Sequence, residues 1–278
     1  EMILFKMPLH ESFAKTALKN VAFRPLFKCK PFPFFLIPVY AMKSLQLLLV
    51  FVAATIIATA DDKQKKGYAP HVVVPDELEA TLFSPNTLTP CVACIGVAPT
   101  GEVYAGVDRI GSLGKGGGKG KIIRLIDVDH DGISEAHTEY AVIDNPRGIV
   151  PVGDRLYVLH TKWGEGRNFN GMFLSVLTDA NGDGKADGPP KHLVKEISTR
   201  KFNQARGVDH TTNGIRMGID GWIYVAIGDF GFADAEGTDG TKLTMYGGGV
   251  IRVRPDGTEL ETYVHGLRNI YDVAIDPF

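Results

Sequence analysis

Apolar and polar residues alternate along much of the chain in a way that predicts short, paired β-strands. Three segments share an apolar strand, a tight turn containing Gly or Asp, and a second strand; they are Gly96–Asp108, Gly148–Thr161 and Gly214–Asp229. A fourth copy begins at Asp272. Alternation over about four to eight residues between turn residues is typical of a half-buried strand. The pattern therefore predicts a β-hairpin that recurs along the chain.

A second unit recurs between these hairpins. It is a strand that runs into a turn rich in Asp and Gly, at Gly120–Gly132, Gly171–Gly184 and Gly247–Thr258. A fourth strand follows, as at Glu139–Ile143 and Glu261–Gly266. The two units together make four short antiparallel strands that repeat at roughly 50 to 75 residues. Stacked blades bury faces that a single blade exposes. We therefore predict an all-β fold, a β-propeller of which about three four-stranded blades are present, with a β-sandwich as the alternative.

The segment from Met42 to Asp62 has the organisation of a secretory signal peptide. A lysine precedes a nearly unbroken apolar run, and Ala58, Thr59 and Ala60 end it with the small-x-small pattern that signal peptidase recognises. An uncleaved membrane anchor is the alternative, although the run is short for a bilayer span. We expect a secreted or periplasmic protein with no stable membrane span after cleavage.

These features divide the chain into four predicted segments. Residues 1–41 are interpreted as a non-native upstream segment, 42–60 as the signal peptide, 61–79 as a linker and 80–278 as a partial β-propeller. The mature chain is expected to begin near Asp61. Because about three blades are too few to close a ring, the chain is interpreted as an N-terminal fragment.

Composition and charge narrow the possible functions. The chain is 44% hydrophobic and 22% charged, as in a globular protein, and its net charge of −2 provides no basic surface for nucleic acid. In the expected mature chain, Cys91 and Cys94 form a CVAC motif, in which Ile95 replaces the histidine of a haem attachment site. The two cysteines are expected to form a short-range disulfide or to be small residues of a strand.

Polar residues recur at one position of the repeat. The repeats can be aligned on the first residue of each inner strand, which is Gly148, Gly214 or Asp272. The residue four positions earlier is Asp144, His210 or Arg268, respectively. The loop that enters the innermost strand of a propeller blade lies at the mouth of the central channel, so we expect these three side chains to converge on one cavity.

The residue types at this position suit proton and charge transfer. A histidine accepts a proton near neutral pH, and an arginine stabilises negative charge or holds an anionic cofactor. The alternative for His210 is a loop residue bonded to a neighbouring backbone group. For Arg268 and Asn269 the alternative is an ion pair and a turn at the start of a strand.

Two of the Asp-rich turns have the ligand spacing of a calcium loop. The first offers Asp127, Asp129, Asp131 and Glu135. The second offers Asp179, Asn181, Asp183 and Asp187. Gly132 and Gly184 supply the sharp turn at the sixth position, but Thr138 and Pro190 stand where the twelfth-position glutamate of an EF-hand belongs. We expect Ca²⁺ sites that differ from an EF-hand and stiffen the blade edge, with polar hairpin turns as the alternative.

The residues of one repeat also resemble a known family. The order H-x3-G-x3-G-x-D-G-x-I-Y-x3-GD runs from His210 to Asp229, and GGGVIRVRPDGT and GLRNIYDVAIDPF follow it. This order resembles the soluble quinoprotein glucose/sorbosone dehydrogenases. More narrowly, the paired Asp-rich turns and the signal peptide resemble planctomycete-type secreted, membrane-bound dehydrogenase-like proteins. The resemblance implies a six-bladed propeller that oxidises a sugar or polyol with pyrroloquinoline quinone (PQQ).

The resemblance also implies roles for individual residues. His210 matches the general base that takes the hydroxyl proton of the substrate while hydride passes to the quinone. Arg268 and Asn269 match residues that contact the quinone, and Asp144 is assigned with them to cofactor binding from its shared position. A c-type cytochrome is the expected electron acceptor. The alternatives are a non-catalytic, calcium-stabilised secreted binding propeller and a propeller lactonase or other hydrolase.

Overall fold

The computed structural model describes residues 2–6, 72–75 and 77–276. The predicted signal peptide and most of the predicted upstream segment lie outside these residues. The chain forms two compact units, one within Ile3–Leu82 and a larger one from Phe83 onward. Strands β1 (Met2–Lys6) and β2 (Glu79–Ser84) pair in a two-stranded sheet. Within the described residues, no helix has both the length and the hydropathy to cross a bilayer.

The first sheet of the larger unit contains four consecutive antiparallel strands. They are β3 (Val92–Val97), β4 (Val103–Asp108), β5 (Gly120–Ile126) and β6 (Ala136–Val142). Each strand pairs with the next one in the sequence, as a propeller blade requires. The hairpin and the following strand-and-turn unit predicted from the sequence together make this sheet.

The second sheet has six strands, where the sequence predicted four. Four of them are consecutive: β7 (Asp144–Val152), β8 (Arg155–Trp163), β9 (Phe169–Thr178) and β10 (Lys191–Lys195). The hairpin of β13 (Phe232–Gly237) and β14 (Lys242–Met245) joins the outer edge of β10, where Val194 pairs with Gly237. The hairpin comes from the third repeat but completes the second sheet. It covers an edge that would otherwise expose unpaired backbone groups.

The third sheet again has four antiparallel strands. They are β11 (Thr212–Met217), β12 (Ile223–Ile227), β15 (Gly248–Val253) and β16 (Glu261–Leu267). Two short helices lie in loops of these sheets. A 3₁₀ turn, η1 (Glu165–Arg167), lies between β8 and β9 of the second sheet, and the α-helix α2 (Arg200–Arg206) lies between β10 and β11 and links the second sheet to the third. The sequence pattern did not predict α2, which is only two turns long and carries one buried residue, Asn203.

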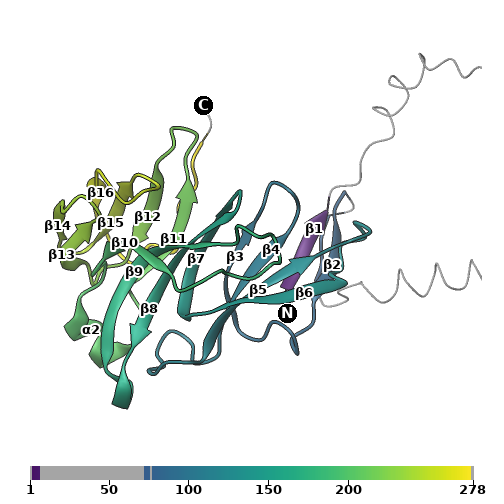
Figure 1. Cartoon of the computed structure of the whole chain (residues 1–278), viewed down its shortest axis with the longest axis horizontal. Coiled ribbons are helices and arrows are strands. Elements are labelled where there is room, and N and C mark those ends of the chain that lie inside the picture. Colours follow the sequence, from purple (N-terminus) through teal and green to yellow (C-terminus); the bar gives the residue numbers. More distant parts are fainter. Residues whose placement is uncertain (1, 7–71, 76, 277–278) are drawn as a thin grey trace, which may run out of the picture. The chain divides into compact units, whose positions relative to one another are not determined.

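The three sheets pack through their innermost strands. Figure 1 shows them side by side, with β7 between β3 and β11. A Cβ on Gly148 of β7 would lie 3.0 Å from the backbone nitrogen of Ile215 in β11, so the absence of a side chain permits this approach. Beyond β11, the Gly214 N–H donates to the Tyr271 carbonyl at 3.0 Å. The predicted all-β fold is confirmed, because nearly all of the described secondary structure consists of antiparallel sheets arranged as the blades of a partial propeller.

The middle sheet is buried on both faces. Val158 and Leu159 are neighbours in β8, so their side chains point to opposite faces, and both are fully buried. Val158 packs with Ile122 and Tyr140 of the first sheet, whereas Leu159 packs with Ile215 of the third. Burial on both faces explains the apolar run Leu156–Leu159 of β8, since consecutive side chains there are all covered.

Candidate functional site

His210 lies in a tight loop between α2 and β11. Its φ of 61° is in the left-handed region, which few non-glycine residues adopt and which is frequent at functional sites. The backbone carbonyl of His210 accepts a hydrogen bond from the Phe230 N–H at 3.2 Å. A Cβ on Gly228 would lie 2.3 Å from the same carbonyl, so only glycine permits the end of β12 to approach this loop. The end of β12 therefore holds the His210 backbone in place.

The imidazole of His210 is flanked by two carboxylates. Its Nδ1 lies 2.6 Å from Asp229 Oδ1, and its Nε2 lies 3.5 Å from Asp209 Oδ2. The ring stacks on Phe230 at 5.5 Å, and the side chain is 17% exposed. Because an ionised carboxylate only accepts hydrogen bonds, Nδ1 donates its proton to Asp229 when the ring is neutral, which leaves Nε2 free to accept one.

Asp229 also faces Arg268. The Arg268 Nε lies 4.0 Å from Asp229 Oδ2, and the arginine side chain is 80% exposed. The two residues that the sequence predicted at one position of successive repeats, His210 and Arg268, therefore meet at a shared carboxylate. Asp229 was missed in the sequence. Its signal was available, since it lies two residues after the end of a buried strand. In the β11–β12 hairpin Thr212 pairs with Ile227, which brings Asp229 to the His210 end.

A cavity of about 230 Å³ opens beside His210. It is lined by Ser112, Arg147, Asp209, His210, Asn213, Asn269 and Tyr271. The structure thus places Asn269, one of the predicted cofactor contacts, in the same cavity as His210. Asn213 is held there because its side-chain amide donates to the Ile270 carbonyl at 2.9 Å. Hydrogen-bond donors and one imidazole therefore face a common space.

Asp144 lies elsewhere. It lines a different cavity, of about 260 Å³, together with His160 and His192. Its carboxylate accepts a hydrogen bond from the Gly118 N–H at 2.6 Å, so it anchors the glycine-rich loop between β4 and β5. Of the three side chains predicted to converge on one cavity, His210 lines this one, Arg268 lies 4.0 Å from Asp229 and is not among the lining residues, and Asp144 lines the other cavity.

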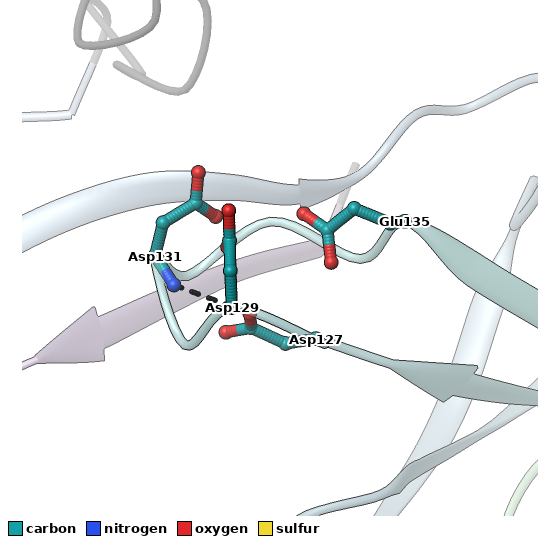
Figure 2. A group of neighbouring side chains, drawn as sticks. All are labelled: Asp127, Asp129, Asp131 and Glu135. Atoms are coloured by element: carbon teal, nitrogen blue, oxygen red, sulfur yellow. Dashed lines mark hydrogen bonds between the residues drawn. The ribbon is translucent and has the colours of Figure 1, made fainter. Parts of the chain in front are cut away.

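The first Asp-rich turn gathers its four acids. The ligand atoms of Asp127, Asp129, Asp131 and Glu135 all lie within 4.8 Å of one another, and Figure 2 shows them around the turn between β5 and β6. Oxygen atoms that share a Ca²⁺ ion at about 2.4 Å are separated by at most about 4.8 Å. These four side chains therefore have the spacing that a calcium ion needs.

The second Asp-rich turn repeats the backbone hydrogen bonds of the first. The carboxylate of Asp127 accepts from the N–H groups of Asp131 and Gly132 at 3.2 and 2.9 Å. Asp179 accepts in the same way from the N–H groups of Asp183 and Gly184, at 3.1 and 2.9 Å. Among groups of three or more His, Cys, Asp or Glu side chains in the described part of the chain, only the acids of the first turn have ligand atoms within 4.8 Å of one another. The Asn181 amide instead accepts from the Asp183 N–H at 2.9 Å.

Cys91 and Cys94 are both free thiols. The disulfide alternative is therefore not formed, and Cys94 serves as a small residue of β3. Although the Cys94 residue is partly exposed, its sulfur is enclosed against β4, where a Cβ on Gly106 would lie 2.5 Å from it. This burial raises the pKa of the Cys94 thiol to about 12. The thiol therefore stays protonated and unreactive near neutral pH.

The chain was compared with known proteins. A family model described as "Domain of unknown function (DUF7133)" matches residues 97–278. No curated protein matches the chain. Among solved structures, the chain is similar to the crystal structure of a provisionally assigned oxidoreductase (glucose dehydrogenase) from Thermus thermophilus, with 17% sequence identity and a TM-score of 0.39. The match covers 61% of this chain and 46% of that chain, so the chain spans less than half the length of that protein.

Proposed function

The chain belongs to the DUF7133 family, whose description states no activity, and from the geometry of its own site we propose that it carries the base of a quinone-dependent dehydrogenase. The substrate is a sugar or polyol hydroxyl, and the acceptor is PQQ. The observation that carries the proposal is the 2.6 Å contact between His210 Nδ1 and Asp229 Oδ1 beside a cavity. An oriented imidazole next to an open cavity is the arrangement of a general base.

The proposed reaction uses both flanking carboxylates. The substrate hydroxyl donates a hydrogen bond to His210 Nε2 and transfers its proton there. A bound quinone would accept the hydride from the carbon that carries this hydroxyl. Asp229 holds the ring by its Nδ1–H, and the imidazolium that forms lies between Asp229 and Asp209. Opposite charges on both sides stabilise that cation, as the aspartate of a catalytic triad stabilises its histidine.

The donors around the cavity fit an anionic quinone. Arg147, Asn213 and Asn269 line the cavity together with one carboxylate, Asp209, and Arg268 lies 4.0 Å from Asp229, the partner of His210. Guanidinium and amide N–H groups are the usual partners of carboxylates, the groups expected on an anionic quinone. The four donor residues would hold the quinone, which when bound supplies the two-electron acceptor. We propose a c-type cytochrome as the acceptor of the electrons from the reduced quinone. Asp144 is not among the residues proposed to hold the quinone.

PQQ titration tests the proposed function. The protein is mixed with PQQ and Ca²⁺, and dye reduction by a panel of aldoses and polyols is followed. We expect PQQ-dependent turnover that falls about 10²–10⁴-fold in His210→Gln, because a general base contributes about that factor. Asp229→Asn should also lower turnover, because it removes the carboxylate that orients the imidazole. His265→Gln, on exposed β16, is the matched histidine control. Absence of PQQ binding, or full activity in His210→Gln, would refute the proposal.

A second candidate function is supported by the first Asp-rich turn. We propose that Ca²⁺ binds Asp127, Asp129, Asp131 and Glu135 and stiffens the blade edge of a secreted binding propeller. Ca²⁺ should raise the thermal unfolding midpoint, because a ligand that binds only the folded state stabilises it. The increase should disappear in Asp129→Asn and persist in Asp256→Asn, a change in the corresponding turn of the third sheet. An equal Ca²⁺ response in both variants would contradict this site.

A further inference from the structure

Arg147 is a partly buried cation without a counter-charge. It lies on β7, and within the described residues it makes no ion pair. Its Nη2 donates to the Val208 carbonyl at 3.2 Å, whereas its Nε is enclosed by protein without a hydrogen-bond partner. A guanidinium has five N–H donors, and burying its charge without an anion or a full set of acceptors is costly. The position of Arg147 therefore calls for an anion.

The carboxylates near Arg147 are engaged by other groups. Asp108 accepts from the Asn145 side-chain amide at 3.0 Å, and Asp272 pairs with Arg216. Asp209 lies 3.5 Å from both Arg206 and His210. Within the described residues, none of these three carboxylates forms an ion pair with Arg147, although Asp209 lines the same cavity.

Arg147 faces space that a ligand can fill. It lines the cavity beside His210 and also a second cavity of about 270 Å³, which is bounded by Cys94, Arg216 and Asp272. Tyr271 lines both cavities as well. An anionic group in either space would meet the guanidinium, and one in the first would share that space with His210.

We propose that Arg147 binds a carboxylate of the ligand in the His210 cavity. Where this carboxylate belongs to the substrate, the substrate is a hydroxy acid of the uronic or aldonic type, which presents its carboxylate to Arg147 and a hydroxyl to His210 Nε2. A planar guanidinium matches a carboxylate in geometry and charge. This assignment rests on the proposed function for the role of His210. The carboxylate belongs either to the substrate or to the quinone, and both have the same chemistry.

Two ligands that differ in one group test the assignment. Binding of D-glucuronate and D-glucose is measured by calorimetry without any quinone, and PQQ is titrated separately. We expect the protein to bind glucuronate about tenfold more tightly than glucose, as one charge-assisted contact provides. Arg147→Gln should remove this preference, and Arg147→Lys should retain part of it. A loss confined to glucuronate assigns the carboxylate to the substrate, and a loss confined to PQQ assigns it to the quinone.

Arg216→Gln is the matched control, because Arg216 lines the second cavity but is already paired with Asp272. It should leave the preference unchanged, and circular dichroism should show that all variants fold. Equal binding of glucose and glucuronate together with PQQ binding that survives Arg147→Gln would overturn the inference. Calorimetry measures binding alone, so its result is independent of the dye-reduction assay of the proposed function. Glucuronate binding through Arg147 without dye reduction in that assay would contradict the proposed dehydrogenase and still support this site.

Discussion

His160 is a buried imidazole outside the proposed active site. It is 3% exposed, and its Nδ1 donates to the Thr161 carbonyl at 2.9 Å. Its Nε2 must then accept from the Ser175 hydroxyl at 2.8 Å, and Ser175 accepts in turn from His192 Nδ1 at 2.8 Å. One backbone carbonyl thus sets the direction of this chain of hydrogen bonds, and desolvation by burial lowers the pKa of both rings.

This burial predicts a loss of stability in mild acid. Desolvation lowers the pKa of His160 from 6.5 to about 4, so the folded protein leaves it neutral where the unfolded chain is protonated. Stability should therefore be fully present above pH 6.5 and decrease as the pH falls toward 4. Between pH 7 and 5 the loss from this group is about 2 kcal/mol. Urea unfolding at both pH values measures it.

The matched variants separate His160 from the other titrating groups. His160→Gln should reduce the difference between pH 7 and pH 5 by about 2 kcal/mol, because glutamine does not titrate. His137→Gln, on the exposed face of β6, should leave that difference unchanged. Equal pH dependence in both variants would show that the buried imidazole is not the cause.

At the scale of elements, the β13–β14 hairpin connects two blades. Its sequence belongs to the third repeat, but its apolar side chains Phe232, Ala235 and Met245 pack with Leu193 and Val194 in the core. The repeat predicted every four-stranded unit, because alternation is a local property of each strand. It did not predict this hairpin, whose apolar residues are widely spaced and have no partner until β10 presents its edge.

Phe232 should therefore support both blades. Phe232→Ala should lower the free energy of unfolding by about 3–5 kcal/mol, because it removes a fully buried ring and leaves a cavity. Tyr246→Ala should change it little, since Tyr246 follows β14 but is 90% exposed. Urea unfolding checks both values. A small effect of Phe232→Ala would mean that the hairpin packs loosely on the second blade.

At the scale of the whole molecule, export is the prediction that lies outside the described residues. Expression with its own leader in a bacterium should yield an exported protein that begins near Asp61, since Ala58 and Ala60 form the cleavage pattern. The intact mass of the exported protein measures the cleavage point. Ala58→Leu should block processing, while Ala54→Leu, within the apolar run, should not. An exported chain that retains residues 42–60 would favour the membrane anchor.

The sequence by itself determined the blade, its repeat, and the shared register of His210 and Arg268. These properties follow from the two-residue period of a strand and from covalent spacing, both of which are local. Only the tertiary structure decided that Asp229 joins His210 to Arg268, that Asp144 turns to the Gly118 loop, and that Arg147 is left without a counter-charge. Those outcomes depend on which edges and charges remain unpaired after distant strands have packed. Of the three, only Asp229 leaves a local signal, its place just after a buried strand.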